Sequence, residues 1–152
     1  MTAWAVRIHD PSPRGYKPAD LHDVLAALGA TIAGCKWVIQ DLECAGDAAE
    51  LAVLVEHNRE AGGVVLTTKD LLGWCSRMGQ VIDAILLAFN SDVDADLRQL
   101  AMRGEDFAGS GAVLKVLAAD NSVLVVAGTD VRMRYLLRCR FKDVSDCDPA
   151  AA

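Results

Sequence analysis

The stretch AVLKVLAADNSVLVVAG, residues 112–128, determines the fold we expect for this chain. It contains two short runs rich in Val, Leu and Ala, 112–118 and 122–127, on either side of Asp120 and Asn121. Asp and Asn tolerate the backbone conformations of a tight turn, so the pattern predicts a β-hairpin. A hairpin pairs its two strands antiparallel.

Two helices have recognisable ends. One follows the hairpin directly, since Thr129 and Asp130 can cap it and an apolar stripe at helical spacing continues to Phe141. The other begins near Pro18, which is tolerated in a first helical turn, and ends at Gly29. Its apolar positions repeat at helical spacing: Leu21, Val24, Leu25 and Leu28.

Alternation and β-branched content predict further strands at 3–9, 35–42, 50–57, 64–66 and 81–89. Thr67 and Asp70 have the spacing of a capping box, which predicts a helix over 71–78. A short helix is expected around Leu97, after an acidic segment, and the glycines between 104 and 111 predict a loop.

Strands mixed with helices without strict alternation indicate an α+β domain. We expect a mainly antiparallel sheet with helices packed on a face over residues 1–144, followed by a disordered tail at 145–152. A doubly wound α/β fold is the alternative.

Composition and charge exclude several classes of protein. A chain of 152 residues with 53% apolar residues is sized for one domain with one core. Its formal charge of -6 repels phosphate backbones and anionic lipid, so neither nucleic acid nor a membrane is an expected partner. The longest apolar stretch, 81–89, is far shorter than the roughly 20 residues that span a bilayer.

The five cysteines form no CxxC pair and no spacing suited to zinc, so we expect reduced thiols. The first residues, MTAWAVRIHDP, lack the basic region and apolar run of a signal peptide. Both observations predict a cytoplasmic protein.

No motif for catalysis, a metal or a cofactor is found, and no cofactor is expected. Asp92, Asp94 and Asp96 begin like a calcium loop, but Leu97 and Arg103 stand where Gly and a bidentate Glu are needed. The pairs His9-Asp10 and His22-Asp23 fall on an expected strand end and an expected amphipathic helix, so we interpret them as chance surface pairs.

The hairpin and the segment TDVRMRYLLRCRFKDV that follows it, together residues 112–144, resemble the ending of several small bacterial α+β families. These families include domains of unknown function and immunity proteins that neutralise toxins of neighbouring cells. A looser likeness covers the strand around residues 35–39. The resemblance implies a stoichiometric binder without chemistry of its own.

Charge and resemblance together favour a non-enzymatic protein-binding module, with an acidic surface that meets a basic partner such as a toxin. The residues expected on that surface are Asp92, Asp94, Asp96, Glu105 and Asp106. One alternative is a small enzyme or ligand-binding protein with a pocket that uses His57 or His22. Another is a self-associating structural module, since 53% apolar residues leave room for a homodimer interface.

Overall fold

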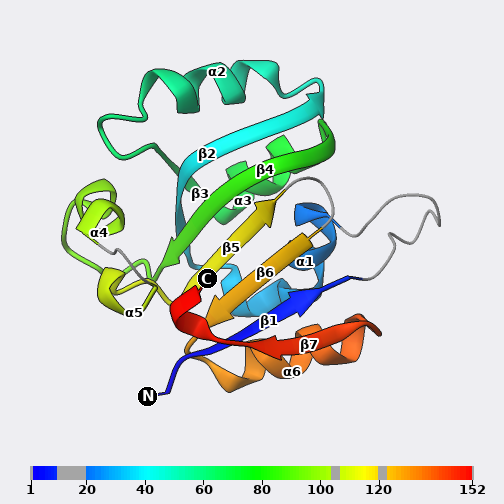
Figure 1. Cartoon of the computed structure of the whole chain (residues 1–152). Coiled ribbons are helices and arrows are strands. Elements are labelled where there is room, and N and C mark those ends of the chain that lie inside the picture. Colours follow the sequence, from blue (N-terminus) through cyan, green and yellow to red (C-terminus); the bar gives the residue numbers. More distant parts are fainter. Residues whose placement is uncertain (1, 10–19, 104–106, 120–122, 152) are drawn as a thin grey trace.

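The computed structural model of the chain describes residues 2–9, 20–103, 107–119 and 123–151 (Figure 1). Within them, seven strands form one sheet in the order β3-β2-β4-β5-β6-β1-β7. The strands are β1 Trp4–Ile8, β2 Lys36–Gly46, β3 Val64–Thr67, β4 Met78–Phe89, β5 Leu114–Ala119, β6 Val123–Gly128 and β7 Val144–Cys147. The helices are α1 Leu21–Leu28, α2 Ala49–His57, α3 Thr68–Cys75, α4 Leu97–Arg103, α5 Phe107–Ser110 and α6 Val131–Arg140, with 3-10 turns η1 Gly29–Ile32 and η2 Pro149–Ala151.

Every strand pair in this sheet is antiparallel, which confirms the α+β prediction and excludes the doubly wound alternative. The predicted hairpin forms from β5 and β6, in a register that pairs Leu114 with Gly128 and Ala119 with Val123. Its expected turn at Asp120 and Asn121 lies outside the described residues.

Helices cover both faces of the sheet. On one face, α1, α3 and α6 pack over the larger core, and α2 packs against β2 and adds Leu51 and Val55 to it. On the other face, α4 and α5 cover a smaller core around Phe89 and Phe107 at one end of the sheet (Figure 1). The deeply buried residues of the larger core include Trp37, Leu25, Leu71, Leu86 and Leu137.

Several helix ends lie where the sequence places them. The Thr67 and Asp130 side chains each accept a hydrogen bond from the first turn of the helix that follows, α3 and α6. Gly29 ends α1 with φ of +49°, a backbone conformation that favours glycine. The cap at the start of α1 is Asp20, so this helix begins at Leu21, and Pro18 lies outside the described residues.

Three segments differ from the sequence prediction. Residues 50–57, expected as a strand, belong to α2, because Leu51 and Val55 are buried one helical turn apart while Val53 is exposed. Residues 107–110, expected in a loop, form the short helix α5 with Phe107 in the core. The expected disordered tail contains β7, which pairs with β1, and η2.

Helix length is modest throughout, and the longest described helix, α6, has 10 residues. None of the helices in the described part of the chain is long and apolar enough to cross a membrane.

Candidate functional site

Three of the five acidic residues predicted to meet a partner fall on the connection between β4 and α4. Asp92, Asp94 and Asp96 are all exposed there, and Asp96 accepts a hydrogen bond of 3.1 Å from the main-chain nitrogen of Arg98 in the first turn of α4. Glu105 and Asp106 lie outside the described residues. The structure therefore places the first three acids on one exposed connection.

The histidines proposed for an alternative pocket do not line one. His57 and His22 are exposed, and neither belongs to the lining of the three cavities described below. His9 is exposed as well. Within the described ranges, no group of three or more His, Cys, Asp or Glu side chains is arranged to hold a metal ion.

The cysteines differ in accessibility. Burial raises the pKa of the Cys75 thiol to about 12, with smaller contributions from Asp20 and Cys44. Burial also raises the pKa of Cys35. Cys139, in contrast, is exposed on α6. A thiolate is the reactive form of cysteine, so these side chains should differ sharply in reactivity.

We expect iodoacetamide at pH 8 to modify Cys139 in the folded protein and to leave Cys75 unmodified, because Cys75 is both buried and protonated. Mass spectrometry of the digested protein would measure the extent at each cysteine, with protein unfolded in guanidinium as the fully modified control. Equal modification of both thiols in the folded protein would contradict the burial of Cys75.

A groove runs along the outer edge of β3. Its cavity has a volume of about 580 Å³. Leu54 and Asn58 of α2 lie on one side and residues 95–98, at the start of α4, on the other, with Val65 of β3 and Lys36 of β2 between them. Within the described residues, β3 is the last strand on this side of the sheet, so no strand pairs with its outer edge.

The main chain of β3 offers hydrogen-bonding groups to this groove. Thr68, just after β3, donates its main-chain N–H to the oxygen of Cys35 at 3.3 Å. Bonded and non-bonded pairs alternate along an antiparallel ladder, and the register pairs Thr67 with Lys36 and Val65 with Val38. The N–H and C=O groups of Val65, which lines the cavity, therefore point away from β2 and into the groove.

The groove also exposes apolar side chains. Val65 is 42% exposed and Leu54 is 48% exposed, and both line the cavity. Met102 of α4, 55% exposed, lies next to Gly62, since a Cβ atom on Gly62 would come within 3.0 Å of its sulfur. Single exposed apolar residues are common, whereas several around one groove are typical of an interaction surface.

Charged side chains of both signs line the groove. Lys36, opposite Thr67, is exposed at one end and takes part in no ion pair with another described residue. At the other end, Asp96 lies 3.9 Å from the guanidinium of Arg98. Arg98 lines the groove as well, and a Cβ atom on Gly62 would come within 3.0 Å of its Cβ. Asp92 and Asp94, on the connection before this pair, have no cationic partner among the described residues.

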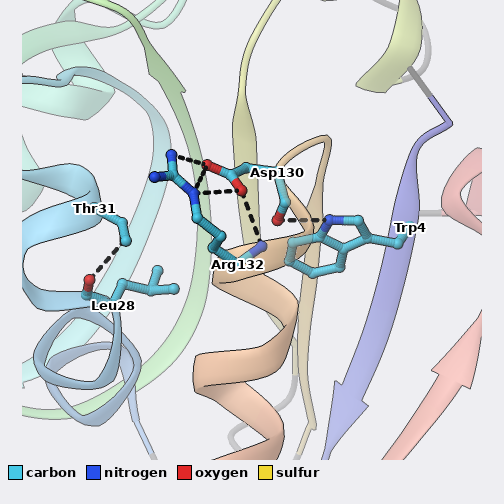
Figure 2. Close-up of polar contacts among 5 residues, drawn as sticks. All are labelled: Trp4, Leu28, Thr31, Asp130 and Arg132. Atoms are coloured by element: carbon cyan, nitrogen blue, oxygen red, sulfur yellow. Dashed lines mark hydrogen bonds and ion pairs between the residues drawn. The ribbon is translucent and has the colours of Figure 1, made fainter.

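A second cavity, of about 680 Å³, lies beside the start of α6, and two of its polar side chains, Asp130 and Arg132, bind each other. Figure 2 shows the Arg132 guanidinium on the Asp130 carboxylate, at 2.7 Å, and the Trp4 indole N–H donating to the Asp130 main-chain oxygen at 3.1 Å. The hydrogen bonds from Arg132 lower the pKa of Asp130. These contacts have a structural explanation, since they fix the first turn of α6.

A third cavity, of about 320 Å³, lies between α6 and β7. Arg134 and Arg138 both donate to one oxygen of Asp146, at 2.7 and 2.5 Å, and these bonds lower the pKa of the Asp146 carboxyl. The contacts hold β7 against α6, so they too are explained by the fold.

The groove was not predicted from the sequence. Residues 50–57, which contribute one wall, were expected to form a strand, and the residues of α4 on the opposite wall are distant in the chain. Gly62 and Gly63 before a short apolar run, with a helix cap at Thr67, were the available signal for a short strand at an edge. Comparison with family models, with curated proteins and with solved structures found no match.

Proposed function

We propose that this protein is a binding module for another protein and that it takes up an extended segment of its partner along β3. The observation that carries the proposal is the outward-facing main chain of Val65 within a groove that also exposes Leu54. An extended peptide adds to such an edge through main-chain hydrogen bonds, while neighbouring side chains supply specificity.

Charge supports a basic partner. The chain carries a formal charge of -6, and Asp92 and Asp94 are exposed on the connection that leads into α4, whose first residues line the groove. Opposite charge accelerates the encounter of two proteins before their surfaces fit together. The resemblance of residues 112–144 to immunity proteins supports the more specific proposal that the partner is a toxin, which is neutralised when it is bound.

The alternative of a small enzyme or ligand-binding protein that uses His57 or His22 gains no support from the positions of these side chains, which are exposed and outside the described cavities. Self-association remains a competing proposal, because a second copy could place a strand in the same groove.

Affinity capture with three baits tests the proposal: the wild type, Val65→Pro and Val65→Thr. Proline removes an N–H that points into the groove and is tolerated in an edge strand, so the pairing of β3 with β2 should survive. Threonine keeps the N–H and serves as the matched control. We expect a stoichiometric basic protein on the wild-type and Val65→Thr columns, released at high salt, and at least about tenfold less on Val65→Pro.

Mass spectrometry of the eluted proteins decides between the proposals. Recovery of the same protein at the same salt concentration from Val65→Pro would contradict binding along β3. Capture of the chain's own copies, lost in Val65→Pro, would favour the self-associating module instead. Circular dichroism of each bait would establish that the variants are folded.

A further inference from the structure

The cavity beside the start of α6 contains polar side chains that contacts within the fold do not explain. Asp130 and Arg132 bind each other. The hydroxyl groups of Thr2 and Thr129 and the side-chain amide of Asn90 also line the cavity, and none of the three makes a hydrogen bond to another described residue. We infer that this cavity binds a small neutral sugar, an uncharged molecule with several hydroxyl groups on a short carbon skeleton.

The polar groups come from parts of the chain that are distant in sequence. Thr2 precedes β1, and Asn90 follows β4. Thr129 lies between β6 and α6, and Thr31 belongs to η1. The fold therefore brings four separate segments around one cavity, whose volume of about 680 Å³ lies in the range of small-molecule sites.

The charge of the lining favours a neutral ligand. Asp130 and Arg132 are its only charged side chains among the described residues, and their ion pair has a distance of 2.7 Å. An anion beside Arg132 would meet the Asp130 carboxylate, and a cation beside Asp130 would meet the guanidinium. A charged ligand must therefore compete with an ion pair that is already formed, whereas a neutral ligand leaves it intact.

The remaining hydrogen-bonding groups require a ligand that both donates and accepts. Thr31 donates its hydroxyl hydrogen to the main-chain oxygen of Leu28 at 2.6 Å, so its oxygen is left as an acceptor. Arg132 donates from Nε and Nη2 to Asp130, so its Nη1 is left with two donors, on the side of the guanidinium that faces Thr31 in Figure 2. A hydroxyl group can donate to one and accept from the other, so a molecule with several hydroxyl groups matches both.

The carbon skeleton of the ligand would meet apolar side chains. Val113, just before β5, and Met133, which is buried in α6, line the cavity as well. Val131, which is 69% exposed, is also part of the lining. Small-molecule sites combine such apolar surface with a few polar groups that fix the orientation of the ligand.

Titration of ¹⁵N-labelled protein followed by NMR tests the inference, with the methyl α-glycosides of glucose, galactose and mannose as probes. From the affinity usual for each atom of a small ligand, we expect at least one of them to bind with a dissociation constant of about 1 mM. The signals of Asn90 and Thr129 should shift, and that of Val65 should not. The uronic acid and the amino sugar derived from the tightest probe should bind at least about tenfold more weakly, because each carries a charge.

Two substitutions locate the binding site. Asn90→Ala removes the amide, and Thr129→Val replaces the hydroxyl group with a methyl group of similar size. Because neither polar group has a partner among the described residues, both variants should fold, which circular dichroism would establish. Each should weaken binding about fivefold through the loss of one hydrogen bond. Gln99→Ala is the matched control, since it removes an exposed amide of α4 outside the cavity and should keep the wild-type affinity.

Three results would each overturn the inference: no binding of any of the three glycosides, a charged analogue that binds as tightly as the neutral probe, or unchanged affinity in both Asn90→Ala and Thr129→Val. None of them bears on the proposed function, because the groove along β3 and this cavity share no described lining residue. The capture experiment with Val65→Pro decides that proposal separately.

Discussion

Gly63→Ala is expected to lower the free energy of unfolding by about 3 kcal/mol, one of the two largest effects that we anticipate for this protein. Gly63 has φ of +111°, where a residue with a side chain is strained. A Cβ atom there would overlap the main-chain oxygen of Ile39, which belongs to the neighbouring strand β2. Neither backbone can yield without shifting the start of β3.

Urea unfolding followed by circular dichroism would measure this loss, and Gly73→Ala is a suitable control. Gly73 lies in α3 and is exposed, and a Cβ atom at this position would meet nothing within 4 Å. Alanine should therefore stabilise that helix by about 0.5–1 kcal/mol. Both substitutions replace Gly with Ala, but we expect the first to lower the free energy of unfolding and the second to raise it. A loss below about 1 kcal/mol in Gly63→Ala would contradict the close contact with β2.

Trp37→Ala should lower the free energy of unfolding by about 4 kcal/mol, because it removes the largest of the fully buried side chains. Trp37 is fully buried in β2, and its indole N–H donates to the Thr68 hydroxyl at 2.9 Å. That hydroxyl donates in turn to the main-chain oxygen of Ile32, at 2.6 Å. The side chain therefore connects β2 with the start of α3 and with η1.

Two milder variants separate packing from hydrogen bonding. Trp37→Phe keeps much of the apolar volume and should cost less than Trp37→Ala, while Thr68→Val leaves the buried indole N–H without its acceptor and should cost about 1–3 kcal/mol. The double variant Trp37→Phe/Thr68→Val should lose less free energy of unfolding than the sum of the two single losses, because each single substitution removes the same hydrogen bond. Additive losses in urea unfolding would contradict the coupling between the two side chains.

The parts of the fold that local sequence could predict are those that local chemistry determines. The two apolar runs of the hairpin lie within the single stretch 112–128, and their antiparallel register needs no distant partner. Thr67 and Asp130 cap their helices through main-chain groups two or three residues away. Such contacts are specified by spacing alone.

The elements in which the structure differs from the sequence prediction depend on contacts between distant residues. Leu51, Val53 and Val55 alternate as in a strand, and only the burial of Leu51 and Val55 against β2 distinguishes the helix. The C-terminal segment contains Ser, Asp and Cys, which do not predict a strand. It becomes β7 by pairing with β1, near the opposite end of the sequence, a contact that no local pattern encodes.

The candidate site divides in the same way. The exposed acids Asp92, Asp94 and Asp96 could be predicted from composition and from their position before a helix. The groove beside them could not, since it exists only where α2, β3 and α4 meet around Gly62 and Gly63. The position of the acidic residues could be predicted from the sequence, but the shape of the groove could not.

The position of β1 between β6 and β7 has a consequence for synthesis on the ribosome. Of the strands in this sheet β1 leaves the ribosome first and β6 and β7, which flank it, leave last, so its hydrogen-bonding edges stay unpaired until residues 123–128 and 144–147 have emerged. β2, β3 and β4 are neighbours in both sequence and sheet and can pair much earlier. During translation the nascent chain therefore presents an unpaired apolar strand, Trp4–Ile8, to the chaperones that bind such segments.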